Sequence, residues 1–184
     1  MNKSITYILL IVVLCVACNK AQDPFQISKQ HVGLLNDSTQ VKDLETIFSN
    51  DSIVKRIGGD EFMGNKNDIE IYEKTGKQLL VLTPSQSLDS TSVIETVRIM
   101  DERYKTDKNI STISTFKDIS NSYKISRIDN LINSIVITVN SINASFTIDK
   151  KELPSNLRVD MDLNIEATHI PDNAKIKYFF INWH

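Results

Sequence analysis

Hydrophobic residues recur at helical spacing in two short stretches of the chain. Three apolar or aromatic side chains in each stretch lie at positions i, i+3 and i+7, which places them on one face of a helix. The two stripes are Val41, Leu44 and Phe48, and Phe116, Ile119 and Tyr123. Hydroxyl residues suited to capping a helix precede them: Ser38 and Thr39, and Ser114 and Thr115. The pattern predicts two short helices.

Short apolar segments after each stripe are typical of β-hairpins. In the first half of the chain, residues 69–73 and 79–82 flank a polar turn in which Gly76 can adopt a positive φ. In the second half, residues 135–139 and 144–148 flank a turn that begins near Asn140 and Ser141. Each half is therefore expected to contain an antiparallel hairpin that follows its helix.

Each half closes on one more apolar segment, at residues 93–100 and at residues 176–183. In addition, residues 157–165 alternate strictly between apolar and polar side chains. Alternation of this kind is typical of a strand with one buried and one wet face. We therefore predict a further half-buried strand in the second half.

The same order of elements thus occurs twice. A helix followed by meandering strands, repeated once, predicts an α+β fold with a mainly antiparallel sheet and two short helices. We expect a single globular domain of residues 26–184, built as two tandem helix-plus-β-meander repeats of about 26–106 and 107–184. Chance similarity is the alternative to a duplication, since short capped helices are common.

The N-terminus carries an apolar segment that is too short to span a bilayer. Lys3 gives a positive start, and residues 5–13 are apolar apart from Thr6 and Tyr7. This arrangement is typical of an export signal, because a membrane-spanning helix needs about 20 apolar residues. The segment closes on Leu14-Cys15-Val16-Ala17-Cys18, which resembles the lipobox of bacterial lipoproteins.

The lipobox resemblance implies a signal peptide of residues 1–17, cleavage between Ala17 and Cys18, lipidation of Cys18 by acyl chains such as palmitate, and a lipidated tether of residues 18–25. Each buried acyl CH₂ contributes about 0.8 kcal/mol, so several chains make a permanent membrane anchor. The resemblance implies the outer membrane of the cell envelope. Because no acidic run follows Cys18, we expect the periplasmic face. A plain secretory signal or an uncleaved anchor is the alternative.

Composition excludes several kinds of chemistry. No cysteine follows Cys18, so the exported part has no disulfide, no thiolate nucleophile and no cysteine metal ligand. The net charge is −2, and removal of Lys3 with the signal makes it −3. Basic and acidic residues are interleaved, and we therefore expect no nucleic-acid partner.

Gly58-Gly59-Asp60-Glu61-Phe62 spells the signature of the diguanylate cyclases. Carried over by position, Asp60 and Glu61 would hold Mg²⁺ and assist attack by a ribose hydroxyl. The phosphate-side segment that this family needs upstream is missing, and an exported domain has no access to GTP. We reject the cyclase interpretation and expect residues 58–68 to form an exposed connector.

No local pattern predicts a metal site, a cofactor or a catalytic residue. His31, His169 and His184 are far apart and lack partners at ligand spacing. Asp160 and Asp162 would share one face of the predicted strand, but no calcium-loop pattern accompanies them. Motifs of serine nucleophiles are also missing. Two carboxylates brought together in space, as in glycosidases, stay possible because sequence does not show them.

Three Asp-Ser pairs resemble the O-glycosylation acceptor of Bacteroidota envelope proteins. The candidate acceptors are Ser38, Ser52 and Ser90, each of which follows an aspartate and precedes Thr or Ile. Asp-Ser pairs also make good turns and helix caps, so a purely structural role is the alternative.

The densest aromatic run extends from Tyr178 to Trp183. On a strand, Tyr178 and Phe180 would lie on one face, and Phe179 and Trp183 on the other. Aromatic residues on both faces indicate either a strand buried on both sides or a recognition surface, and we favour core packing.

Residues 69–84, 114–154 and 170–183 resemble a group of Bacteroidota lipoproteins of unknown function and, more distantly, the sigma-E-regulated envelope lipoproteins of enteric bacteria. The resemblance implies location and architecture, but no activity. We therefore expect a non-enzymatic binding or scaffolding module that presents a curved sheet to an envelope protein or a cell-wall component. The alternative is an envelope hydrolase that acts on glycan or cell wall through a carboxylate cleft.

Overall fold

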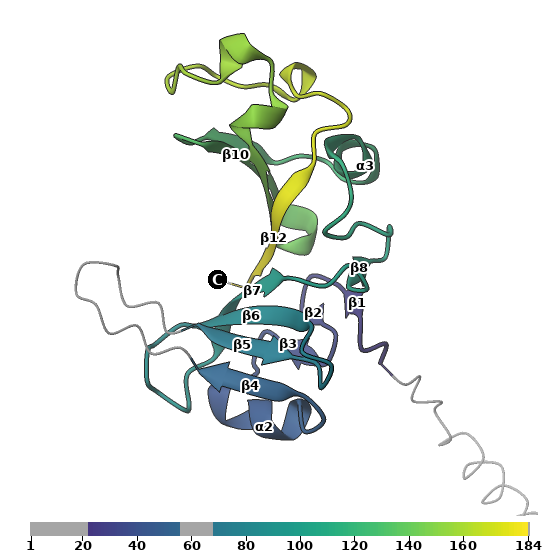
Figure 1. Cartoon of the computed structure of the whole chain (residues 1–184), viewed down its shortest axis with the longest axis vertical. Helices are drawn as coiled ribbons and strands as arrows, with labels where there is room; N and C mark the ends of the chain where they lie inside the picture. The colour runs from purple at the N-terminus through teal and green to yellow at the C-terminus, as the bar shows by residue number, and fades with distance from the viewer. Residues whose placement is uncertain (1–21, 56–67, 184) are drawn as a thin grey trace, which may run out of the picture.

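A computed structural model of the chain describes residues 22–55 and 68–183. The structure confirms the α+β class, with a mainly antiparallel sheet and two short α-helices. Figure 1 shows two lobes joined where the strands β7 and β12 lie side by side. The predicted connector at residues 58–68 lies almost entirely outside the described residues.

One large sheet runs through both lobes. It has eight strands in the order β4-β5-β6-β7-β12-β11-β10-β9, and all neighbours are antiparallel. The strands are β4 (Ser52–Lys55), β5 (Ile69–Tyr72), β6 (Gln78–Pro84), β7 (Ile94–Ile99), β9 (Arg127–Asn130), β10 (Ser134–Val139), β11 (Ala144–Asp149) and β12 (Ile176–Asn182). Each half of the chain thus supplies a four-stranded meander, and the last strands of the two meanders pair with each other.

Cross-strand pairing aligns one apolar side chain from every strand of this sheet. Directly opposed residues form an unbroken row from edge to edge. The row is Ile53, Ile71, Leu80, Ile99, Phe179, Phe146, Ile137 and Ile128. Opposed apolar pairs stabilise a sheet because their side chains contact directly. A single hydrophobic core consequently extends through both lobes.

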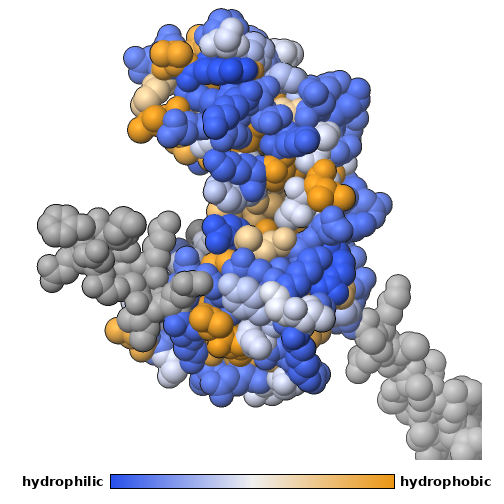
Figure 2. Space-filling view, in the orientation of Figure 1, coloured by the Kyte–Doolittle hydropathy of each residue, from blue (hydrophilic) through white to orange (hydrophobic). Residues whose placement is uncertain are grey.

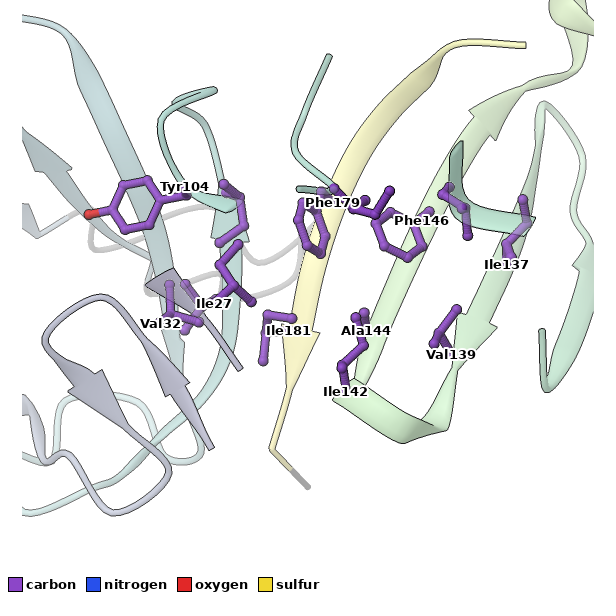
Figure 3. Packing of buried hydrophobic residues seen from close by; sticks show 14 of the residues in the cluster. Ile27, Val32, Tyr104, Ile137, Val139, Ile142, Ala144, Phe146, Phe179 and Ile181 are labelled. Atoms are coloured by element: carbon purple, nitrogen blue, oxygen red, sulfur yellow. The ribbon is translucent and has the colours of Figure 1, made fainter. Parts of the chain in front are cut away.

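A small second sheet lies against the first lobe. It has the order β3-β2-β1-β8, with strands β1 (Gln26–Ile27), β2 (His31–Val32), β3 (Leu35–Asn36) and β8 (Lys105–Thr106). Figure 3 shows Ile27 and Val32 to one side of β12, and Ala144 and Phe146 of β11 to the other. Burial of Ile27 and Val32 joins this sheet to the common core.

Gly33 holds the small sheet close to the preceding chain. Its φ is +57°, and a Cβ at this position would stand 2.3 Å from the carbonyl oxygen of Pro24. A side chain does not fit there, so the turn between β2 and β3 requires glycine.

Both predicted helices form. In the first lobe, the 3₁₀ turn η1 (Val41–Asp43) leads into α2 (Leu44–Ile47), and in the second lobe α3 comprises Phe116–Ser122. Thr115 is the N-cap of α3 as expected, and its N–H and hydroxyl donate to the Asp118 carboxylate at 2.8 and 2.9 Å.

Ser38 and Thr39 are not the caps of the first helix, contrary to expectation. The N-cap is Gln40, whose N–H donates to the Asp43 carboxylate at 3.2 Å. Thr39 is buried instead, and its hydroxyl oxygen accepts the N–H of Asn36 at 2.9 Å. The Thr39 hydroxyl, which the sequence predicted as a helix cap, thus stabilises a local turn instead.

The predicted hairpins also form, and their turns use the expected kinds of residue. Gly76 has a φ of +88° between β5 and β6. Asn143 has a φ of +53° after the 3₁₀ turn η2 (Asn140–Ile142), between β10 and β11. Asparagine tolerates this left-handed conformation better than most side chains.

The strand predicted at residues 157–165 is wrong. The chain forms the 3₁₀ turns η3 (Lys150–Glu152) and η4 (Ser155–Leu157), continues without strand pairing to residue 166, and then forms η5 (Ala167–His169). Alternation alone does not make a strand, because a strand also needs a neighbour whose backbone groups pair with its own. Here the segment is held by the side-chain amide of Asn130, at the end of the edge strand β9, and forms no backbone ladder.

Within the described residues, no helix is long and apolar enough to cross a bilayer.

Candidate functional site

Four cationic side chains and one carboxylate surround a pocket of about 410 Å³ at the far end of the second lobe. The pocket is lined by Ile132, Asn133, Asp149, Lys150, Lys151, Arg158 and Lys177. We call it the basic pocket. Its residues come from the β9–β10 turn, the end of β11, the chain after η4, and β12. The meander and its long last connection therefore bring together residues that are distant in sequence.

Lys150 is the unusual member of the basic pocket. Its side chain is 4 % exposed, and its Nζ has no hydrogen-bond partner among the described residues. Only its backbone is tied down, because its N–H donates to the carbonyl oxygen of Asn133 at 3.0 Å. Removing an ammonium from water costs several kcal/mol unless a partner compensates. Lys150 is thus a residue of the pocket lining whose buried ammonium has no compensating group among the described residues.

Asp149 is already paired within the protein. One of its carboxylate oxygens accepts the N–H of Lys151 at 3.0 Å, and the other accepts Lys177 Nζ at 3.1 Å. These two hydrogen bonds lower the pKa of Asp149, and the bond to Asp149 raises the pKa of Lys177. Asp149 thus orients Lys177 and does not neutralise Lys150.

Arg158 closes the pocket from the connection between β11 and β12. Its Nε donates to the carbonyl oxygen of Leu153 at 2.8 Å, which fixes the stem of the side chain. A guanidinium presents several donors in one plane, so Arg158 retains further N–H groups. Such a fork is suited to phosphate or carboxylate.

A second pocket, of about 380 Å³, lies between α3 and the chain after β8. Of its two lysines, Lys108 differs from Lys150 because its Nζ donates to the carbonyl oxygen of Ser122 and lies 4.5 Å from the ring centroid of Tyr123. Cation–π contacts of this kind satisfy an ammonium within the protein. The basic pocket is therefore the stronger candidate for a ligand.

The aromatic residues between Tyr178 and Trp183, for which the sequence offered core packing or recognition, divide between the two faces of the large sheet. Phe179 and Trp183 are buried, whereas Tyr178 is 39 % exposed and Phe180 is half-buried. The guanidinium of Arg98 lies 5.7 Å from the Tyr178 ring centroid. The expectation that the sheet meets a protein or cell-wall partner stays a prediction.

The most densely charged cluster of the first lobe is saturated by its own members. Asp101 is fully buried and accepts Arg103 Nη2 at 2.7 Å, Arg103 Nε at 3.0 Å and Lys77 Nζ at 3.1 Å. Arg103 also reaches Glu73 at 2.9 Å. Burial alone would raise the pKa of Asp101, but these hydrogen bonds outweigh it and lower the pKa to about 2. The cluster holds the fold and offers no free group.

Among the described residues, no three His, Cys, Asp or Glu side chains come together as a metal site. Asp160 and Asp162 do not share a strand face, since no strand forms there, and Asp160 instead accepts the N–H of Asp162 at 2.9 Å. His169 accepts the N–H of Glu166 at 3.2 Å. His184 lies outside the described residues.

The predicted modification sites divide into two groups. Ala17, Cys18 and the cyclase-like residues 58–62 lie outside the described residues. Ser38, Ser52 and Ser90 are all exposed. The Asp89 carboxylate beside Ser90 accepts the N–H and the hydroxyl of Thr91 at 2.8 and 2.7 Å, so this pair does form a turn. Glycosylation of the three serines stays a prediction.

Sequence reasoning missed the basic pocket. Lys150 and Lys151 are adjacent in sequence, but Arg158 and Lys177 join them only through the connection that was predicted as a strand. A useful signal was available at Lys150, because it follows β11 with the spacing of an inward-facing residue.

No protein-family model matches the chain, and no curated protein sequence matches it. Its fold is similar to the crystal structure of the uncharacterized protein YfeY from Escherichia coli. The TM-score is 0.54 at 13 % identity, over 85 % of this chain and 99 % of that one. The likeness to an enteric bacterial protein is thus a likeness of fold, and the relation to Bacteroidota lipoproteins stays a prediction.

Proposed function

We propose that this chain is a lipid-anchored protein of the cell envelope that binds an anionic envelope component without converting it. The observation that carries the proposal is the buried Lys150 ammonium, which lines the basic pocket and has no partner in the described chain. Lys151, Arg158 and Lys177 add positive charge at the rim. A phosphate or a carboxylate is the kind of group that such a set of donors recognises.

Binding is favoured over catalysis by the character of the pocket. A hydrolase of glycan or cell wall needs two carboxylates on either side of the bond that it cleaves. The basic pocket contains one carboxylate, Asp149, which is engaged by Lys151 and Lys177. Four cations around one committed acid are suited to holding an anion.

Anchoring is proposed at Cys18, on the periplasmic side of the outer membrane, because the sequence before it resembles a lipobox. The described chain begins at Gln22 beside the first lobe, whereas the residues that line the basic pocket belong to strands and connections of the second lobe, which Figure 1 shows at the opposite end of the molecule. A tether of this kind leaves the pocket free to meet a ligand. The intact mass of the mature protein tests the anchor, since a mass without acyl chains at Cys18 would contradict it.

The test of anion binding is calorimetry with inorganic pyrophosphate and with inorganic phosphate. We expect Lys150→Met to weaken binding at least about tenfold, because a charge-assisted hydrogen bond contributes about 1.5–3 kcal/mol. The same variant should unfold at equal or higher urea concentration, with a gain of about 1 kcal/mol, because it replaces an unpaired buried charge by an apolar chain of similar length. A loss of binding with a gain of stability is characteristic of a binding residue.

Lys124→Met is the matched control, because Lys124 is exposed and does not line the pocket. It should change neither the affinity nor the stability. Equal pyrophosphate affinity of the wild type and Lys150→Met would refute the proposed site, and so would a large destabilisation of Lys150→Met, which would mark Lys150 as a structural residue.

A further inference from the structure

Four large apolar side chains are exposed beside the basic pocket. Leu131 and Ile132 in the β9–β10 turn are 47 and 68 % exposed, and Val159 and Met161 after η4 are 87 and 52 % exposed. We call these four residues the apolar tip. Figure 2 shows hydrophobic surface gathered at this end of the second lobe. Exposed apolar groups that cluster in this way mark an interaction site more often than scattered ones do.

The fold holds the two parts of the apolar tip in place. The N–H of Leu131 donates to the carbonyl oxygen of Ser134 at 2.9 Å and closes the turn. The side-chain amide of Asn130 donates to the carbonyl oxygens of Asp160, Met161 and Leu163 at 3.1, 3.2 and 3.0 Å. Asn130 thus connects the segment of Val159 and Met161 to the turn of Leu131 and Ile132. The four apolar side chains are therefore exposed on segments that hydrogen bonds hold in place.

The apolar tip and the basic pocket share one rim. Ile132 belongs to both, and Val159 follows Arg158 directly in the chain. Two acids, Asp160 and Asp162, alternate with the apolar residues of the second part. The surface therefore presents apolar groups, an anion-accepting pocket, and a few carboxylates that an amine can meet. A phospholipid has the matching parts: acyl chains, a phosphate and, in many envelopes, a headgroup amine.

We propose that this end of the molecule docks on a phospholipid bilayer, with a headgroup phosphate in the basic pocket and the apolar tip in the interfacial layer. The inference rests on the proposed anion binding and names its ligand. Apolar side chains next to cations are the usual means by which a protein adheres to an anionic membrane surface. Because the described chain begins beside the first lobe, docking through the second lobe supplies a contact with lipid at the other end of the molecule from the proposed anchor (Figure 1).

The experiment measures co-sedimentation with vesicles that contain phosphatidylethanolamine and phosphatidylglycerol. It uses residues 18–184 with Cys18→Ser, which cannot be lipidated and which contain every described residue. We expect the protein to sediment with these vesicles and to be released by high salt, because salt screens the charge interactions. Leu131→Ser with Val159→Ser, two residues of the apolar tip that do not line the basic pocket, should lower vesicle affinity at least about tenfold, since both side chains lose their apolar contact with lipid.

Ile113→Ser is the matched control. Ile113 is 70 % exposed, between the values of Leu131 and Val159, but it lies beside the second pocket. It should leave vesicle binding unchanged. The double variant should also bind free pyrophosphate like the wild type, which separates the lipid contact from the anion site.

Several results would overturn the inference. One is that the wild type binds free pyrophosphate but no vesicles, a result that leaves the proposed anion site standing. Another is that the double variant sediments like the wild type. A third is that Lys150→Met keeps full vesicle affinity, which would remove the headgroup phosphate from the pocket. Tighter binding to an acidic peptide than to pyrophosphate or to the vesicles would assign the surface to a protein partner and would also contradict the inference.

Discussion

Asp101 and Lys150 are two buried charges with opposite surroundings. Asp101 accepts hydrogen bonds from Arg103 and Lys77, so its charge is compensated inside the protein. Lys150 has no such compensation in the described chain. A buried charge that is paired keeps its charged form stable inside the protein. An unpaired buried charge costs free energy that a bound counterion can offset. The difference assigns Asp101 to the fold and makes Lys150 the residue on which the proposed anion site rests.

Protonation of Asp101 should make the stability of the protein depend on pH in the acidic range. The pKa of Asp101 is about 2 in the folded protein, against 3.8 ordinarily. A carboxyl whose folded pKa is lowered stabilises the fold above its unfolded pKa and loses that effect as pH falls through the folded one. We therefore expect about 2 kcal/mol of stability to disappear between about pH 4 and pH 2. Urea denaturation across this range measures the loss.

Asp101→Asn supplies the control for that pH dependence. At pH 7 the variant should be about 3 kcal/mol less stable than the wild type, because it leaves Arg103 and Lys77 without their buried counterion. The difference should shrink as the pH falls through about 2, because Asp101 becomes protonated in the wild type over this range. A difference that stays constant from pH 7 to pH 2 would contradict the assignment.

At the scale of the elements, the turn between β5 and β6 makes a separate prediction. Gly76 has a φ of +88°, and a Cβ there would contact nothing within 4 Å. Gly76→Ala should still destabilise the protein by about 1 kcal/mol, because a side chain strains the backbone at positive φ even where space is free. Urea denaturation checks this value.

Asn143→Gly tests the same principle in the opposite direction. Asn143 has a φ of +53° and already bears the cost of a side chain in the left-handed conformation. Replacing it by glycine should leave stability unchanged or raise it slightly. A Gly76→Ala variant as stable as the wild type would show that the turn relaxes to another geometry.

Elements that depend on local pattern were predictable from the sequence. Phe116, Ile119 and Tyr123 mark a helix face by spacing alone, and Gly76 marks a turn by its backbone freedom. The segment around Val159 and Met161 was not predictable, since its alternation fits a strand but the side-chain amide of Asn130 holds it and no backbone ladder forms. Whether a pattern becomes a strand depends on partners that are distant in sequence, which no local window contains.

The small sheet escaped prediction for a related reason. Its strands are two residues long, so no periodicity develops within them. The parallel pairing of β1 with β8 joins Gln26 to Lys105 across the entire first meander. The basic pocket could not be predicted for the same reason, because Lys150 and Lys177 come together only when β11 pairs with β12.

At the scale of the whole molecule, the junction between β7 and β12 determines how the protein unfolds. Phe179 is fully buried in this junction, opposite Ile99 and with its ring centroid 4.6 Å from that of Phe146. Phe179→Ala should lower the free energy of unfolding by about 3–5 kcal/mol. Because the core is shared, both lobes should still unfold in one transition.

Two probes check this prediction. Trp183 fluorescence reports on the end of β12, and hydrogen exchange compares the amides of β5 and β6 with those of β10 and β11. Coincident transitions would support one cooperative unit. Separate transitions for the two meanders would show that each lobe is stable alone.

The placement of β12 has a consequence for the timing of folding. The strand β12 completes the middle of the large sheet, and its partner β7 precedes it by about eighty residues. Until residues 176–182 have been synthesised, β7 has no partner on one of its edges. A nascent chain that stops before β12 therefore lacks a central strand of the sheet and not a dispensable edge. Co-translational quality control should accordingly be sensitive to truncation within residues 176–182.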